Sequence, residues 1–188
     1  MGGSRLSESE LVFEKLSRSH SQLVSAFSCS HKDEDEFIKR DAFANQQFRL
    51  SETFLLLECG KLISYVTLGI GSFVLSQERQ FHGLRIREKP YNFPNKVPCM
   101  LICKLATDSR EEGRGGASHL LSFAFQEAIR KSVLVPFPFL ALHAYPEKVD
   151  FYRKRGFEVA FAPKSGAGNE TVCMFMELPS DDGGHGSN

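Results

Sequence analysis

The sequence lacks an excess of either charge, a long apolar run and a regular spacing of its cysteines. Lysine plus arginine number 23, and so do aspartate plus glutamate, so no overall field would attract nucleic acid or an anionic membrane. Any RNA partner would need a local basic patch. No apolar stretch approaches the roughly 20 residues of a membrane span, and residues 1–10 lack the apolar segment of a signal peptide. We therefore expect a cytoplasmic protein.

The cysteines form neither a Cys-x-x-Cys pair nor a zinc-type spacing with histidine, and their number is odd. They are Cys29, Cys59, Cys99, Cys103 and Cys173. This pattern predicts reduced thiols and no metal site. Cys99 and Cys103 fall on one face of a predicted strand, so both are candidates for the core.

The length and composition of the chain are those of one globular domain. The chain has 188 residues, 41% of them hydrophobic and 24% charged, which suffices for one substantial core. We expect a flexible lead over residues 1–9 and a single domain over 10–179. The tail 180–188, rich in glycine, aspartate and serine, is expected to be disordered.

Hydrophobic periodicity and breaker residues predict an alternation of strands and helices. The expected order is a strand over 11–17, short helices from 21 and from about 30, strands over 52–59 and 62–70 joined as a hairpin, an irregular stretch over 71–96, a strand over 97–107, a helix over 117–131, a strand over 139–144, a short helix opened by Pro146, and strands over 157–161 and 171–178. Both hairpin strands are almost continuously apolar, which predicts that both of their faces are covered.

A glycine-rich loop, Arg110 to Gly116, connects the predicted strand 97–107 to the helix that follows. The first amides of a helix have no intrahelical acceptor, and the helix dipole adds positive potential there. Gly113, Gly115 and Gly116 allow positive φ and close approach of a ligand, while Arg110 and Arg114 add positive charge. The loop is therefore predicted to bind an anion such as a phosphate.

Two common nucleotide motifs fit this loop poorly. A Walker loop needs a lysine after its glycines, and none follows here. A dinucleotide-binding loop wants glycine or alanine where Ser118 stands, and an acidic residue at the end of the next strand. That strand instead ends in His143, Ala144 and Tyr145.

The loop fits the pattern Arg/Gln-x-x-Gly-x-Gly/Ala, and residues 151–157 fit Phe-Tyr-x-x-x-Gly-Phe. With these motifs and its order of elements, the chain resembles the GNAT superfamily of acyl-CoA N-acetyltransferases. The resemblance implies an α/β (α+β) fold with a mixed, mostly antiparallel sheet of about six or seven strands, splayed between strands 4 and 5 and flanked by about four helices.

The resemblance also implies a cosubstrate, acetyl-CoA, and its binding residues. The strand end would contact the pantetheine arm and the loop amides the pyrophosphate, through Leu105, Ala106, Thr107, Arg110, Glu111, Glu112, Gly113, Arg114, Gly115, Gly116 and Ala117. Tyr152 would be the general acid that protonates the departing thiolate. Candidates for the general base are Glu58, His82 and His143, of which His143 is favoured because it lies near the predicted splayed strand end.

The resemblance predicts transfer of an acetyl group to a primary amine, but it does not identify the amine. A narrower similarity points to the GNAT toxins of toxin-antitoxin modules, which acetylate the amino group of aminoacyl-tRNA. It rests on Phe27-x-Cys29, Phe37, Ala42, Thr53, Tyr65-x-x-Leu68, Val97-Pro98 and Lys104-Leu105-Ala106. The chain departs from those toxins at Ser30 and Lys104. The toxin alternative implies tRNA and an antitoxin protein as partners, and a homodimer is compatible with either alternative. A CoA-binding regulatory module without turnover is the remaining alternative.

Overall fold

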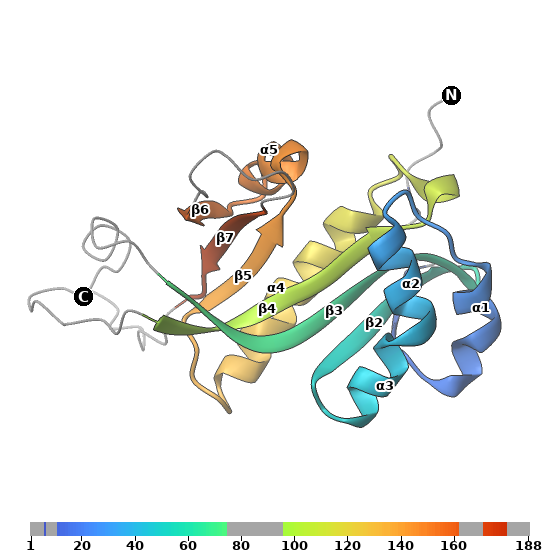
Figure 1. The fold of residues 1–188 in the computed structure, drawn as a ribbon, viewed down its shortest axis with the longest axis horizontal. Helices are drawn as coiled ribbons and strands as arrows, with labels where there is room; N and C mark the ends of the chain where they lie inside the picture. The colour runs from blue at the N-terminus through green and yellow to red at the C-terminus, as the bar shows by residue number, and fades with distance from the viewer. Residues whose placement is uncertain (1–5, 7–10, 75–95, 162–170, 180–188) are drawn as a thin grey trace, which may run out of the picture. The chain divides into compact units, whose positions relative to one another are not determined.

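The computed structural model describes residues 6, 11–74, 96–161 and 171–179. The predictions for residues 1–5, 7–10 and 180–188, for most of the irregular stretch over 71–96 and for His82 lie outside these ranges. Figure 1 shows the main elements, which are β1 (Leu11–Lys15), α1 (Ser21–Ala26), α2 (Lys32–Arg40), α3 (Ala42–Gln47), β2 (Ser51–Glu58), β3 (Lys61–Val74), β4 (Lys96–Thr107), α4 (Gly116–Ser132), β5 (Phe139–Ala144), α5 (Val149–Arg153), β6 (Glu158–Phe161) and β7 (Val172–Glu177).

The seven strands are hydrogen-bonded in the order β1-β2-β3-β4-β5-β7-β6. Every described register is antiparallel, joining β1 to β2, β2 to β3, β5 to β7 and β6 to β7. The predicted fold class is confirmed, and the predicted order of elements matches. One boundary differs by more than two residues, because β3 continues to Val74 into the stretch predicted to be irregular, and the helix expected from about residue 30 is divided into α2 and α3.

The chain divides into two compact units, and the first comprises residues 1–70 and 101–126. Its centre is the hairpin of β2 and β3, turned by Cys59 and Gly60 with φ angles of 49° and 74°. Positive φ at both central residues is the geometry of a type I′ turn, whose twist matches that of the flanking strands. The tight hairpin predicted at Cys59-Gly60-Lys61 is thus confirmed.

Both faces of this hairpin are covered, as its apolar strands predicted. The short helices α1, α2 and α3 lie over one face (Figure 1), where the Tyr65 phenol donates a hydrogen bond to the Glu34 carbonyl at 2.7 Å. On the other face, Phe123 of α4 stacks on Phe13 with ring centroids 4.6 Å apart and meets Phe54 at 4.9 Å. The centre of the hairpin is therefore a rigid base for the loop that follows β4.

The strand β4 interrupts the alternation that the sequence predicted. Cys99 is buried, but Cys103 is exposed, so its assignment to the core is wrong. A Cβ built on Gly69 would lie 3.0 Å from the Cys103 Sγ, and the next residue, Lys104, reaches Glu34 of α2 on that same face. Since neighbouring side chains share a face there, the period of two fails at this point.

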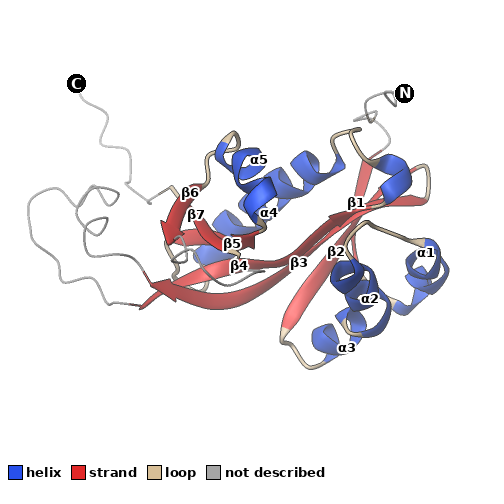
Figure 2. Ribbon diagram, turned by 45° about the horizontal axis from the view of Figure 1, so that its top comes forward, coloured by secondary structure: helices blue, strands red, loops and turns tan. Residues whose placement is uncertain are grey.

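The second unit comprises residues 71–100 and 127–188. Its core contains Phe73, Phe139 and Phe175, whose ring centroids are 5.2–5.5 Å apart. Figure 2 shows β7 between β5 and β6, with α5 leading into β6. No described helix in either unit is long and apolar enough to cross a membrane.

Candidate active site

The glycine loop lies between the end of β4 and the start of α4, with a short 3-10 turn at Ser109–Glu111. Gly113 and Gly115 have φ angles of +80° and +100°. Side chains other than glycine rarely adopt such angles, and no atom lies within 4 Å of a Cβ built at either position. The backbone of the loop is therefore open on its outer side.

Several amides at this end of α4 have no acceptor within the part of the chain that the structure describes. The amides of Ser118 and His119 bond to the Gly115 carbonyl at 2.9 and 3.2 Å. Among the hydrogen bonds of the described ranges, none is donated by the amides of Gly115, Gly116 or Ala117. Because α4 runs for 17 residues, its dipole adds positive potential at these amides, and the site fits an anion such as a pyrophosphate.

Gly116 has a different role from the other two glycines. Its φ is not positive, which corrects the expectation from the sequence. Instead, a Cβ on Gly116 would lie 2.3 Å from the Ser64 Oγ, which donates a hydrogen bond to the Thr107 Oγ1 at 2.9 Å. The close approach here is between α4 and β3 rather than between backbone and ligand.

Arg110 is held by Asp108, which is fully buried. The guanidinium of Arg110 donates to both carboxylate oxygens at 2.8 and 2.7 Å and to the Ala26 carbonyl at 2.8 Å. Asp108 also accepts from the backbone amides of Arg110 and Ser28. Burial alone would raise the pKa of Asp108, but the hydrogen bonds outweigh it and lower the pKa to about 2.

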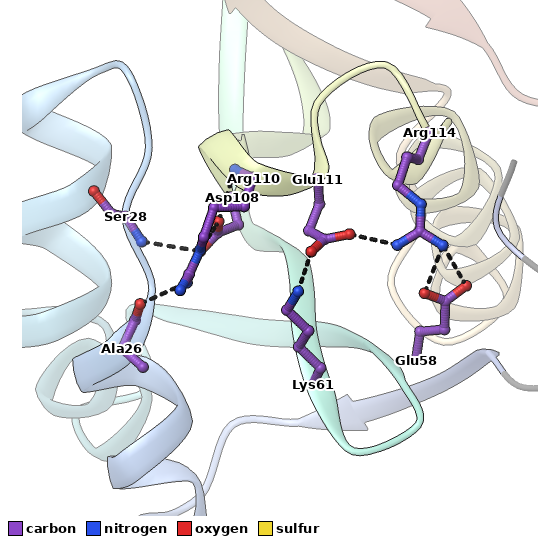
Figure 3. A network of polar contacts seen from close by, with 8 residues as sticks. All are labelled: Ala26, Ser28, Glu58, Lys61, Asp108, Arg110, Glu111 and Arg114. Atoms are coloured by element: carbon purple, nitrogen blue, oxygen red, sulfur yellow. Dashed lines mark hydrogen bonds and ion pairs between the residues drawn. The ribbon is translucent and has the colours of Figure 1, made fainter. Parts of the chain in front are cut away.

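Arg114 is held by two further carboxylates, as Figure 3 shows. Its guanidinium pairs with Glu58 at 2.8 Å and also with Glu111. Glu111 is buried and pairs on its other side with Lys61. The hydrogen bond from Lys61 lowers the pKa of Glu111, and the one from Arg114 adds to the effect despite the burial.

The loop is therefore clamped to its own unit by side chains of both charges. Three carboxylates and three cations take part, so the positive charge expected from the two arginines is balanced in place. The backbone amides of Gly115, Gly116 and Ala117 take no part in these pairs and donate no hydrogen bond within the described residues. Of the predicted pantetheine residues, Leu105 is half-buried, while Ala106 belongs to the hydrophobic core.

In the second unit, Tyr152 lies on α5, half-buried between two phenylalanine rings. Its ring meets Phe151 at 5.2 Å and Phe157 at 5.8 Å, both edge to face. The Arg155 guanidinium lies 3.6 Å from the centroid of the Phe151 ring and donates to the Phe151 carbonyl at 2.8 Å. Gly156 ends the helix with φ of +89°. The predicted helix, ended by glycine, is confirmed, and aromatic packing fixes the tyrosine ring.

The candidate bases lie in different environments. Glu58 is paired with Arg114 beside the glycine loop. His143 is an exposed residue on β5, opposite Cys173 of β7 in the register. The pairing of Glu58 leaves His143 as the described candidate with an accessible side chain.

Comparison with solved structures identifies the fold. The chain is similar to AtaT complexed with acetyl-methionyl-tRNAfMet, with a TM-score of 0.70 and 19% identity over 89% of this chain and 94% of the other. It is also similar to AtaTR bound with AcCoA, with a TM-score of 0.68 and 18% identity over 90% and 95% of the two chains. The chain has the GNAT fold. The fold that the resemblance implied is thus confirmed.

One curated relative extends the GNAT comparison to the level of sequence. The chain is 28% identical over 138 residues to a tRNA-acetylating toxin of Mycobacterium tuberculosis, covering 73% of this chain and 79% of the toxin. No family model matches the chain.

Two anchors of the glycine loop, Asp108 and Lys61, were not among the residues predicted from the sequence. Asp108 carries a recognisable signal, because an aspartate directly before a turn commonly caps it through its side chain. Lys61 carries none, since its partner Glu111 is 50 residues away in the chain.

Proposed function

We propose that this chain is an acetyl-CoA-dependent N-acetyltransferase whose acceptor is the amino group of aminoacyl-tRNA. The observation that carries the proposal is the similarity to a tRNA-acetylating toxin over 73% of the chain. The structure of AtaT with acetyl-methionyl-tRNAfMet, which has the same fold, adds support. An antitoxin protein is a further proposed partner, since a similar structure holds AtaT bound to the C-terminus of the antitoxin AtaR.

The loop geometry supports acetyl-CoA as the cosubstrate. The start of α4 offers amides to a pyrophosphate, and the end of β4 places Leu105 and Thr107 beside it in the chain. When bound, acetyl-CoA supplies the acetyl group as a thioester. The protein's part in binding is a preformed backbone site, so little ordering is needed when the ligand arrives.

Tyr152 is the proposed general acid. As the amine forms its bond to the acetyl carbon and the bond to sulfur breaks, the phenol donates its proton to the departing thiolate. The ordinary pKa of tyrosine is near 10, which makes it a weak acid in water but a suitable donor to a thiolate within hydrogen-bond reach. The two phenylalanine rings around Tyr152 would restrict its orientation.

His143 is the proposed general base, which must receive the proton that the amine loses. Its support is its exposed position on β5. Replacing it by alanine should lower kcat/KM with charged tRNA, because the proton that the amine loses then has no side-chain acceptor. An unchanged kcat/KM would favour a water relay.

The acceptor can be tested by following thiol release from acetyl-CoA with charged tRNA, the same tRNA without its amino acid, and a panel of small amines. We expect rapid release with charged tRNA alone, together with acetylation of its aminoacyl group. Release with small amines but not with charged tRNA would overturn the acceptor and leave a general amine acetyltransferase. Binding of acetyl-CoA without release in any reaction would indicate a regulatory module.

A further inference from the structure

The geometry points to Glu111 as a positioning residue for acetyl-CoA: an acidic side chain in the anion site that strengthens the binding of an anion. This inference rests on the proposed function and deepens it. Glu111 stands directly before the exposed Glu112 and the glycines, at the point where the backbone leaves the 3-10 turn. Its carboxylate is 4% exposed, so it is part of the protein interior.

Glu111 connects the loop to two separate anchors. One carboxylate oxygen pairs with Lys61 at the start of β3, and the other with Arg114, three residues further along the loop. Arg114 in turn pairs with Glu58 at the end of β2. Figure 3 shows the carboxylate between the two cations. One buried group therefore fixes both the start of the loop and its middle against the hairpin.

The position of Arg114 matters because of its neighbours in the chain. It lies between Gly113 and Gly115, the two loop residues with positive φ, which have the least steric restraint of their own. With Glu111 and Glu58 holding Arg114, the two glycines keep one conformation, and the amides that follow stay aimed at one point. Without the carboxylate, that order must be restored each time a ligand binds, and the lost entropy weakens binding.

Simple electrostatics predicts the opposite effect of Glu111 on the affinity for coenzyme A. Glu111 carries a negative charge close to the proposed pyrophosphate, and its removal would release Lys61 and Arg114 as cations. If charge dominated, Glu111→Gln would bind coenzyme A more tightly. Because the carboxylate is buried and paired twice, its structural role should prevail, and the variant should bind more weakly.

The experiment compares Glu111→Gln with Glu112→Gln by calorimetry with coenzyme A. Each removes one negative charge, but the exposed Glu112 side chain makes no hydrogen bond or ion pair within the described residues. We expect Glu111→Gln to raise the Kd about tenfold or more, whereas Glu112→Gln should lower it slightly. Glu58→Gln, a milder variant that frees only one side of Arg114, should raise the Kd about threefold. With acetyl-CoA as substrate, KM should rise in Glu111→Gln, while its kcat at saturation changes little.

Amide hydrogen exchange separates this inference from the proposed function. Without any ligand, Glu111→Gln should raise the exchange rate of residues 112–117 and Glu112→Gln should not. Unchanged exchange, or tighter binding in Glu111→Gln, overturns the positioning role even if the enzyme acetylates charged tRNA. If exchange is faster in Glu111→Gln but the wild type does not bind coenzyme A, Glu111 still positions the loop and the proposed function is overturned.

Discussion

The glycine loop and the Tyr152 segment are held in place by different forces. Around the loop, carboxylates and cations form a connected set of ion pairs, and the backbone is the proposed binding surface. Around Tyr152, the contacts are aromatic rings and one arginine stacked on a ring. The described contacts of the loop are ion pairs that fix a stretch of backbone, whereas those of the Tyr152 segment are ring contacts that fix one side chain.

This difference suggests that the two regions have different roles, the loop in binding and the Tyr152 segment in proton transfer. A pyrophosphate can be bound by amides that any sequence supplies, provided that the backbone is fixed, so the specific residues lie behind the loop. Proton transfer needs one acid at one position, so the specific residue is Tyr152 itself. Variants of the loop region should therefore change binding and stability, and variants of the Tyr152 segment should change turnover.

The largest effect is expected from Tyr152→Phe. Loss of the hydroxyl group removes the proposed general acid but keeps the ring between Phe151 and Phe157. We expect kcat to fall by about 100-fold or more, which is typical of a lost general acid, while the Kd for acetyl-CoA stays the same. Steady-state kinetics and calorimetry provide both values. Unchanged turnover would eliminate Tyr152 as the acid.

Gly116→Ala should reduce both stability and binding. The new Cβ would collide with the Ser64 Oγ at 2.3 Å, and Ser64 is fully buried. Overpacking of this kind costs about 1–3 kcal/mol of unfolding free energy, measurable by urea denaturation. Ser64→Ala in the same chain removes the colliding oxygen and should recover part of the loss. A double variant no more stable than Gly116→Ala would show that the contact is not the cause.

Asp108→Asn should change how stability depends on pH. The pKa of Asp108 is about 2 in the folded protein, below its value of about 3.9 in an unfolded chain, so the unfolded state takes up protons first as the pH falls. The wild type should thus lose stability between about pH 4 and pH 2. The variant should be about 1–2 kcal/mol less stable at pH 7 and nearly equal at pH 2, as measured by denaturation at each pH.

Asp150→Asn is a suitable comparison for Asp108→Asn. Its side chain is 82% exposed and pairs with Arg153 at 3.4 Å on the surface of α5. Exposed pairs contribute little, so this variant should follow the wild type at every pH. An equal change in both variants would mean that burial of Asp108 has no special effect.

The smallest effect is expected from Arg155→Met. The variant removes the cation above the Phe151 ring and the hydrogen bond to the Phe151 carbonyl, both of which restrain the segment that carries Tyr152. We expect kcat to fall a few-fold, in line with about 1 kcal/mol for such a contact, and the Kd for acetyl-CoA to stay constant. Arg153→Met, which loses only a surface pair, should match the wild type. Weaker CoA binding in Arg155→Met would break the division between the two regions.

The sequence predicted most of the fold because the signals were local. Glycines, prolines and the period of apolar residues placed every described strand and the long helix α4 to within a few residues. The positive φ of Gly113 and Gly115 was likewise predicted, since few other residues adopt it. These features depend on neighbours in the chain.

The roles of Lys61 and Glu58 as anchors of the loop could not be predicted, because each pairs with a residue in a distant part of the chain. Glu58 was a candidate base, yet the structure pairs it with Arg114, 56 residues away. Cys103 was a candidate for the core because strict alternation along β4 places it on the same face as Cys99, yet it is exposed. For both residues, tertiary contacts decide the environment of the side chain.

The two-residue turn at Cys59 and Gly60 has a consequence for the order of assembly. Its register sets Glu58 opposite Lys61, so the hairpin alone places one carboxylate beside one ammonium group. A hairpin with so short a turn can form in about 1–10 μs, well before contacts between distant segments. The hairpin would then be formed before the glycine loop packs against it. Inserting one residue in this turn would separate the two charges, so that the loop would lose this pair of partners.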